Sequence, residues 1–152
     1  IHEIDILVNI GGLPDKVFAL QPPKVHTQIE GEDGIVMVAQ LPGGGVGLMS
    51  HSTATPTSEP RRKVTVTFSR GEISFDPFGT ELSRSTPDGV TIEALEAGRS
   101  GALRAMIREF RDCIVENRES AMSGREGLRD LSVVLAAYRS VASKKEVDVE
   151  QP

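Results

Sequence analysis

The sequence predicts an α+β fold with a largely antiparallel, open β-sheet and helices packed on one face. Short β-branched runs separated by Gly- and Pro-rich turns fill the middle of the chain. One amphipathic helical pattern precedes these runs, and two more, with a short final strand, follow them. Strands segregated from helices along a chain are typical of this class. At 152 residues and 38% hydrophobic composition, we expect one globular domain spanning residues 1–152.

The first helix is predicted from apolar residues that recur at helical spacing, namely Ile1, Ile4, Leu7 and Val8. His2, Asp5 and Asn9 follow one another at intervals of three and four residues. An imidazole, a carboxylate and an amide therefore share a second face of this helix. Gly11-Gly12 is expected to end the helix.

Strands are predicted next, at residues 16–20 and in a hairpin formed by residues 35–41 and 46–53 around a Pro-Gly-Gly-Gly turn. The run 35–39 is apolar at both odd and even positions. We therefore expect both faces of that strand to be covered, one by helices and the other by another subunit. Residues 55–60 are predicted to be a surface loop.

A second hairpin is predicted at residues 63–76, where apolar and polar residues alternate around Arg70-Gly71. Residues 79–99 are rich in Gly, Ser, Thr and charge, and predict at most a short strand near residues 90–92. A last short strand is expected at residues 146–149.

Two helices are predicted near the end of the chain. The first carries an apolar stripe of Leu103, Met106, Ile107, Phe110 and Ile114. The second begins with a capping box, in which the Ser123 hydroxyl caps the helix and Glu126 reaches back. Its expected buried stripe consists of Leu128, Leu131, Val134, Leu135, Tyr138 and Val141.

Composition argues against several function classes. The net charge is −5 and no run of Lys and Arg exceeds three residues, so we expect no nucleic-acid partner. The longest apolar runs are far shorter than the ~20 residues that cross a bilayer, and we expect no membrane segment. The start of the chain does not read as a secretory leader. The single cysteine, Cys113, fits a reducing compartment, and we expect a cytoplasmic protein.

Two further kinds of site are not expected. The glycines at 43–47 do not match a dinucleotide-binding fingerprint, and a strand rather than a helix follows them, so they predict a hairpin turn. The three histidines, His2, His26 and His51, lie in separate elements, and Cys113 lies within an amphipathic helix. We therefore predict no metal site.

His2 and Asp5 are the candidates for chemistry. A histidine can hold or release a proton near neutral pH, and a carboxylate one turn away can orient it or bind a substrate hydroxyl. A His and an Asp on a helix also occur on ordinary solvated faces. His51 ends its strand and could reach a cleft at the sheet edge, although a lone strand histidine is more often structural.

The order of these elements resembles the C-terminal domain of the glucose–fructose oxidoreductase, inositol dehydrogenase and rhizopine-catabolism (Gfo/Idh/MocA) family. His2-Glu3-Ile4-Asp5-Ile6-Leu7 is similar to the family's H-x-I-D-L-L helix. Residues 33–52 are similar to its glycine-turn hairpin, and residues 110–149 to its closing segment. The resemblance covers nearly the whole chain.

The resemblance implies an NAD- or NADP-dependent oxidoreductase that acts on a sugar, an inositol or a related polyol. His2 would be the catalytic acid/base, and Asp5 would bind substrate hydroxyls. His51 is a further candidate for substrate binding, because of its place at the end of its strand. NAD or NADP would be bound by an N-terminal Rossmann domain, absent from this sequence, that precedes the present domain in a longer two-domain protein. The resemblance also implies a homodimer or homotetramer assembled through the sheet face.

Some family features are missing from this chain. The nucleotide loop, the family lysine and the aspartate four residues before the histidine would all lie before Ile1, so we expect the isolated 152-residue chain to be inactive. Two alternatives stay open: a non-catalytic self-association module and an NAD-dependent glycosidase on the same scaffold. Substrate specificity is expected to come from residues 21–33 and 79–99.

Overall fold

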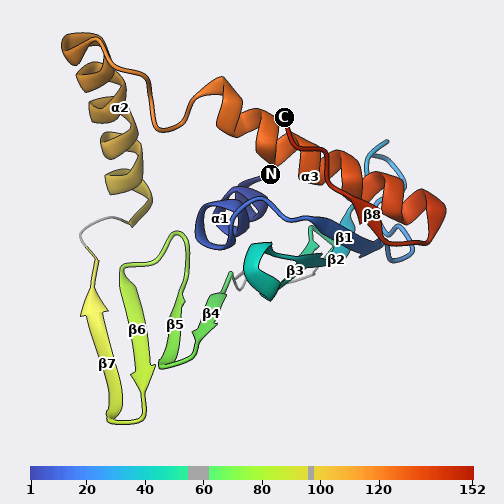
Figure 1. Ribbon diagram of the computed structural model, residues 1–152, viewed down its shortest axis with the longest axis horizontal. Coiled ribbons are helices and arrows are strands. Elements are labelled where there is room, and N and C mark those ends of the chain that lie inside the picture. Colours follow the sequence, from blue (N-terminus) through green and yellow to red (C-terminus); the bar gives the residue numbers. More distant parts are fainter. Residues whose placement is uncertain (55–61, 96–97) are drawn as a thin grey trace. The chain divides into compact units, whose positions relative to one another are not determined.

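The structure is a computed structural model that describes residues 1–54, 62–95 and 98–152, so the loop predicted at residues 55–60 lies outside the described residues. Its elements, drawn in Figure 1, are α1 (His2–Gly11), β1 (Lys16–Leu20), β2 (Gly34–Gln40), the 3-10 turn η1 (Pro42–Gly44), β3 (Val46–Ser52), β4 (Val64–Phe68), β5 (Gly71–Phe75), β6 (Glu81–Thr86), β7 (Gly89–Ala94), α2 (Gly98–Glu116), α3 (Gly124–Ser143) and β8 (Val147–Asp148). The chain forms two compact units, residues 1–56 with 121–152, and residues 57–120.

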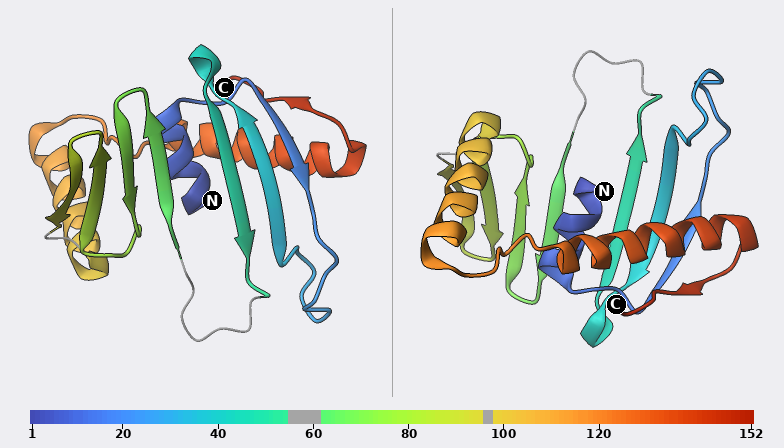
Figure 2. Two further views of the ribbon diagram at one scale, coloured as in Figure 1. Left: turned by 90° about the horizontal axis from the view of Figure 1, so that it is seen from below. Right: turned by 90° about the horizontal axis from the view of Figure 1, so that it is seen from above.

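The first unit is a four-stranded sheet in the order β3-β2-β1-β8, in which each pair is antiparallel. Figure 2 shows α3 lying across one face of this sheet. The predicted α+β class with antiparallel strands is confirmed, although the strands form two sheets rather than one. The helix predicted at the start of the chain and the hairpin around η1 are also confirmed.

The core of the first unit lies between the sheet and the two helices α1 and α3. It consists of Ile4, Val8, Leu13, Val17, Ala19, Met37, Ala39, Val133, Ala136, Ala137 and Val149. In β2, Met37 and Ala39 are fully buried, whereas Val36 and Val38 are 41% and 42% exposed. Helical cover of one face is therefore confirmed, and cover of the other face by a second subunit stays a prediction.

The buried face of α3 differs from the predicted one. Small side chains point to the sheet at positions Val133, Ala136, Ala137 and Ser140, which share one face at helical spacing. The predicted stripe is wrong for its four large members Leu128, Leu131, Leu135 and Tyr138, which are 44–50% exposed. Its other members, Val134 and Val141, are partly buried against the core. The prediction chose the larger residues for the buried face because it used hydrophobicity alone. A helix that lies directly on a sheet instead needs small residues at the contact.

The predicted capping box of α3 is also wrong. Ser123 occupies the N-cap position, but its side chain makes no capping hydrogen bond. The Glu126 carboxylate instead accepts a hydrogen bond from the Arg129 guanidinium at 2.6 Å. This ion pair within the helix replaces the bond that Glu126 was expected to make to the backbone.

The second unit is a four-stranded antiparallel sheet in the order β4-β5-β6-β7. The hairpin predicted at 63–76 is confirmed as β4 and β5, and residues 79–99 contain two strands where at most one short strand was expected. Gly71 starts β5 with φ +154°, and a Cβ atom there would lie 2.3 Å from the Ser85 carbonyl oxygen. Glycine at this position therefore allows β5 and β6 to pair closely.

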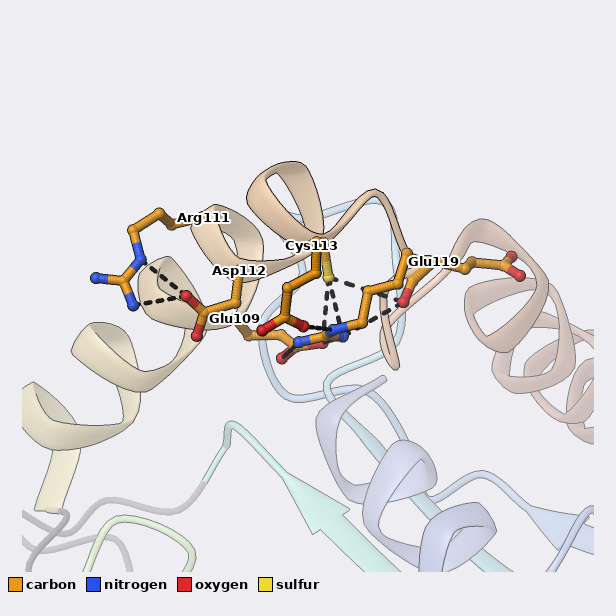
Figure 3. Close-up of polar contacts among 7 residues, drawn as sticks. Glu109, Arg111, Asp112, Cys113 and Glu119 are labelled. Carbon is orange, nitrogen blue, oxygen red and sulfur yellow. Dashed lines mark hydrogen bonds and ion pairs between the residues drawn. The ribbon is translucent and has the colours of Figure 1, made fainter.

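The end of α2 is held by Arg118, which bonds back to side chains of the helix. Figure 3 shows Glu109 and Cys113 of this cluster in close-up. The Arg118 guanidinium donates to both carboxylate oxygens of Glu109 at 2.8 Å and to Glu116 at 2.7 Å. The Cys113 thiol lies in the same cluster, 3.2 Å from an Arg118 nitrogen. Burial, followed by the hydrogen bond to Glu109, raises the pKa of the Cys113 thiol and so disfavours its reactive thiolate.

We expect Arg118→Ala to speed amide hydrogen exchange in the last turn of α2, because the bidentate bond to Glu109 is lost. Arg111→Ala is the matched control. The exposed Arg111 bonds to its neighbour Asp112 at 2.6 Å, as Figure 3 shows, and such a surface pair contributes little. Equal exchange rates in the two variants would contradict the role given to Arg118.

Candidate functional site

Helix α1, which carries predicted site residues, packs into the core of the first unit. Ile4 and Val8 of α1 are buried in the core of the first unit. On β3, a Cβ atom at Gly47 would lie 2.6 Å from the Leu7 side chain, so the glycine lets the helix approach this strand. Gly12 ends α1 with φ +82°, which glycine adopts without strain. The polar face of α1 is thus fixed relative to β3 and α3.

One pair at this face joins α1 to β3. His51 Nδ1 lies 3.5 Å from a carboxylate oxygen of Glu3. Partial burial raises the pKa of Glu3, but a hydrogen bond from its own backbone N–H and the nearby His51 imidazole, when protonated, outweigh this effect and lower that pKa overall. Glu3 is therefore an anion that attracts the imidazole of His51 toward α1.

A second pair joins α1 to α3. The Asn9 amide donates to the Asp5 carboxylate at 2.8 Å and to the Asp5 carbonyl at 2.9 Å, so the predicted shared face of these two residues is confirmed. Asp130 of α3, only 7% exposed, lies close enough to Asp5 to sense its charge. Burial and the Asp5 charge raise the pKa of Asp130.

The structure therefore places the three predicted site residues on one unit but in different contacts. Asp5 is bonded to Asn9 and lies near Asp130, and His51 is paired with Glu3. His2 is the first residue of α1 and is exposed to solvent. The catalytic role of His2 and the substrate-binding roles of Asp5 and His51 stay predictions.

Sequence reasoning missed Glu3 and Asp130. Glu3 was passed over because its partner His51 is distant in sequence. Asp130 precedes Val133 by three residues and Ala137 by seven, so it shares their buried face. If the face of α3 with small residues had been predicted to be buried, the same spacing would have predicted that the Asp130 carboxyl is buried too.

The loop between β1 and β2 is fixed by acidic side chains. Asp33 is 3% exposed, and one of its carboxylate oxygens accepts hydrogen bonds from the backbone N–H groups of Val25 and His26 at 2.7 and 2.6 Å. Tyr138 of α3 donates to the Glu32 carboxylate at 2.8 Å. The loop to which specificity was assigned is therefore attached to α3 and to its own C-terminal end.

Asp33 makes the free energy of unfolding depend on pH. The bond from the His26 N–H lowers the pKa of Asp33 more than burial raises it, and the Val25 N–H lowers it further. The stabilisation is therefore present above the ordinary Asp pKa of about 3.9 and is lost as pH falls through the lower pKa of the folded state. We expect the urea midpoint of wild type to fall below pH 4 more steeply than that of Asp33→Asn, and parallel pH curves would contradict this.

Residues 1–54, 62–95 and 98–152 contain neither a cluster of metal-binding side chains nor a membrane-spanning helix. Within these ranges, no three His, Cys, Asp or Glu side chains are grouped to hold a metal ion. None of the described helices is long and apolar enough to span a membrane. An open depression of about 560 Å³ lies on the second sheet, between residues that include Arg62, Asp76 and Ile92, and it contains none of the predicted site residues.

Comparison with known proteins decides the family. Residues 1–149 match the oxidoreductase family, C-terminal alpha/beta domain, of the Gfo/Idh/MocA group. The chain belongs to this family. The polar face of α1, with His2 and Asp5, thus lies in an oxidoreductase C-terminal domain, and the resemblance inferred from the sequence is confirmed. A search of curated proteins found no match.

Solved structures share the fold of this Gfo/Idh/MocA domain. An oxidoreductase from Agrobacterium radiobacter in complex with NAD+, L-tartaric acid and magnesium is 24% identical, with a TM-score of 0.83 over 97% of this chain and 47% of its own. Levoglucosan dehydrogenase in complex with NADH and L-sorbose is 16% identical, with a TM-score of 0.89 over 99% and 48%. A putative myo-inositol dehydrogenase from Sinorhizobium meliloti is 24% identical, with a TM-score of 0.76 over 98% and 48%. The chain spans about half the length of these proteins.

Proposed function

We propose that this domain is the substrate-binding half of an NAD(P)-dependent oxidoreductase that acts on a sugar, an inositol or a related polyol. The observation that carries the proposal is the fixed polar face of α1, in a chain that belongs to an oxidoreductase family. Three related folds come from proteins whose names or complexes include NAD+ or NADH, levoglucosan, L-sorbose or myo-inositol. These names support the substrate class that we propose.

The described residues do not fit a dinucleotide site of their own. Gly43 and Gly44 lie in the turn η1 between β2 and β3, and no helix follows to direct its N-terminus at a phosphate. NAD or NADP, bound by another part of a longer protein, would supply a hydride acceptor. This chain would then supply the groups that bind the substrate and take its proton.

In the proposed reaction, His2 accepts the proton of the substrate hydroxyl as the carbinol is oxidised to a carbonyl. A neutral imidazole is suited to this step near neutral pH, and exposure at the start of α1 leaves it accessible. Asp5 accepts a hydrogen bond from a neighbouring substrate hydroxyl. His51, drawn toward α1 by Glu3, contributes a further polar contact.

The test is an assay of the full-length protein, in which this chain is joined to its upstream half, with NAD+ or NADP+ and a panel of aldoses, anhydrosugars and inositols. We expect reduced nicotinamide to form with at least one polyol. Release of a sugar from a glycoside without net cofactor reduction would instead support the glycosidase alternative. Absence of nicotinamide binding would overturn the proposal and favour a self-association module.

We also propose that the exposed face of the first sheet joins copies of the chain into a dimer or tetramer. Val36, Val38, Val46 and Leu48 are 41–74% exposed on β2 and β3. Val38→Asp is expected to produce monomers in sedimentation equilibrium at micromolar concentration. Val25→Asp, in a loop and 64% exposed, is the control and should not change the mass. A monomeric wild type would contradict the assembly.

A further inference from the structure

The contact between Glu3 of α1 and His51 of β3 lies at the end of α1 that carries His2. A carboxylate oxygen of Glu3 is 3.5 Å from His51 Nδ1. The Glu3 and His51 side chains are 38% and 44% exposed, so each is partly shielded and still accessible from solvent. The pair therefore places a second imidazole beside the first turn of α1.

The packing of α1 on β3 directs His51 to this position. Gly47, Met49 and His51 alternate along β3 and share one face of the strand, on which Met49 packs against the core. A Cβ atom at Gly47 would lie 2.6 Å from the Leu7 side chain of α1. Glu3 precedes Leu7 by four residues and shares its face of the helix. The faces that bring Leu7 onto Gly47 are therefore the faces on which Glu3 and His51 meet.

The contact determines which ring nitrogen of His51 carries the proton. Burial raises the pKa of Glu3 less than its own backbone N–H and the protonated His51 ring lower it, so Glu3 is ionised near neutral pH. A carboxylate close to Nδ1 favours the neutral tautomer that has its proton on Nδ1, because that hydrogen is attracted to the negative charge. Nε2 then keeps a free lone pair and accepts hydrogen bonds.

The side chains that we propose for the substrate site then share one polarity. The Asp5 carboxylate is an acceptor, the neutral His2 ring takes a proton, and His51 Nε2 accepts as well. Each of these groups needs a hydroxyl that donates. A substrate with neighbouring free hydroxyls meets this requirement, whereas an analogue that lacks one of them leaves an acceptor without its partner.

We propose that Glu3 is a positioning residue that fixes His51 as a hydrogen-bond acceptor, through Nε2, for a polyol hydroxyl near the reacting one. This inference rests on the proposed function. It makes the site selective, because a polyol with a free hydroxyl at that position is bound more tightly than its deoxy analogue. Glu3 acts through His51 and does not touch the substrate.

The first arm of the test needs no catalysis. Nitrogen NMR of the histidine side chains of the 152-residue chain, at about pH 9 where histidine is ordinarily neutral, is expected to show His51 with its proton on Nδ1. Glu3→Ala should move this proton toward Nε2. The control Glu150→Ala, which removes an exposed carboxylate paired with Arg139, should not. A proton on Nε2 in wild type, or an unchanged tautomer in Glu3→Ala, would overturn the proposal.

The second arm measures steady-state kinetics of the full-length protein with its best polyol. His51→Ala should raise KM about three- to tenfold, the effect of one lost hydrogen bond, with a smaller change in kcat. Glu3→Ala should also raise KM, and the double variant should have the KM of His51→Ala, because Glu3 acts through the ring. Effects on KM that multiply in the double variant would overturn the positioning role.

Monodeoxy analogues of the same polyol identify the hydroxyl that His51 contacts. In wild type, one analogue should have a raised KM, and His51→Ala should bind that analogue and the parent polyol equally. An unchanged KM in His51→Ala, or the same penalty for each analogue in both enzymes, would overturn the substrate contact. Absence of turnover in wild type would reject the proposed function, and the substrate contact with it, while the first arm still decides whether Glu3 fixes the ring.

Discussion

His2→Gln in the full-length protein is expected to lower kcat by about 10²–10⁴-fold with little change in KM. The range is that of a lost general base, and glutamine keeps a polar side chain but cannot take a proton near neutral pH. The measurement is steady-state reduction of NAD(P) at saturating polyol. Because His2 is exposed at the first position of α1, we expect the variant to keep the wild-type fold.

His26→Gln is the matched control for this variant. His26 lies in the loop between β1 and β2, where its ring is 3.4 Å from the Thr53 carbonyl oxygen, and we assign it no part in the reaction. We expect its kcat to stay within about threefold of wild type, as for surface changes remote from the chemistry. Equal losses in the two variants would contradict an acid/base role for His2.

Ser140→Ala is expected to lower the free energy of unfolding by about 1–3 kcal/mol, the usual effect of leaving a buried polar group without a partner. Ser140 is fully buried, and its hydroxyl accepts a hydrogen bond from the Ala19 N–H at 2.9 Å and donates to the Lys145 carbonyl at 2.6 Å. The paired part of β8 reaches only Lys16 and Val17 of β1. The Ser140 hydroxyl therefore supplies the hydrogen-bond acceptor that a neighbouring strand would otherwise provide for the Ala19 N–H.

Urea unfolding followed by circular dichroism measures this effect. Ser143→Ala is the control, because the Ser143 hydroxyl lies near the exposed end of α3 and contacts the Ser140 carbonyl at 3.4 Å. We expect a change within about 0.5 kcal/mol for this control. A midpoint for Ser140→Ala that matches the control would show that the buried hydroxyl is dispensable.

Local patterns in the sequence were sufficient to predict much of the first unit. Apolar residues at helical spacing predicted α1, and the same spacing predicted that Asp5 and Asn9 share a face. A run of β-branched residues followed by a glycine turn predicted β2 and β3. Both signals arise within about ten residues of chain. The confirmed elements are those whose geometry is determined by such local periodicity.

Contacts between distant segments were beyond this kind of reasoning. The close approach of α3 to β1 selects small residues such as Ala136 for the buried face and leaves Leu131 exposed, which reverses the order expected from hydrophobicity. The pairs Glu3 with His51 and Asp5 with Asp130 join segments separated by 48 and 125 residues. Their existence depends on how the helices pack, and a single sequence does not show this.

The central claim is that the polar face of α1 binds the substrate, with His2 at the reacting hydroxyl. A crystal structure of the full-length protein with NAD(P) and a polyol substrate tests it most directly. We predict that the reacting hydroxyl lies about 2.6–3.2 Å from a ring nitrogen of His2 and that a neighbouring hydroxyl donates to Asp5. A polyol bound away from α1, with neither His2 nor Asp5 within hydrogen-bond distance, would contradict the claim.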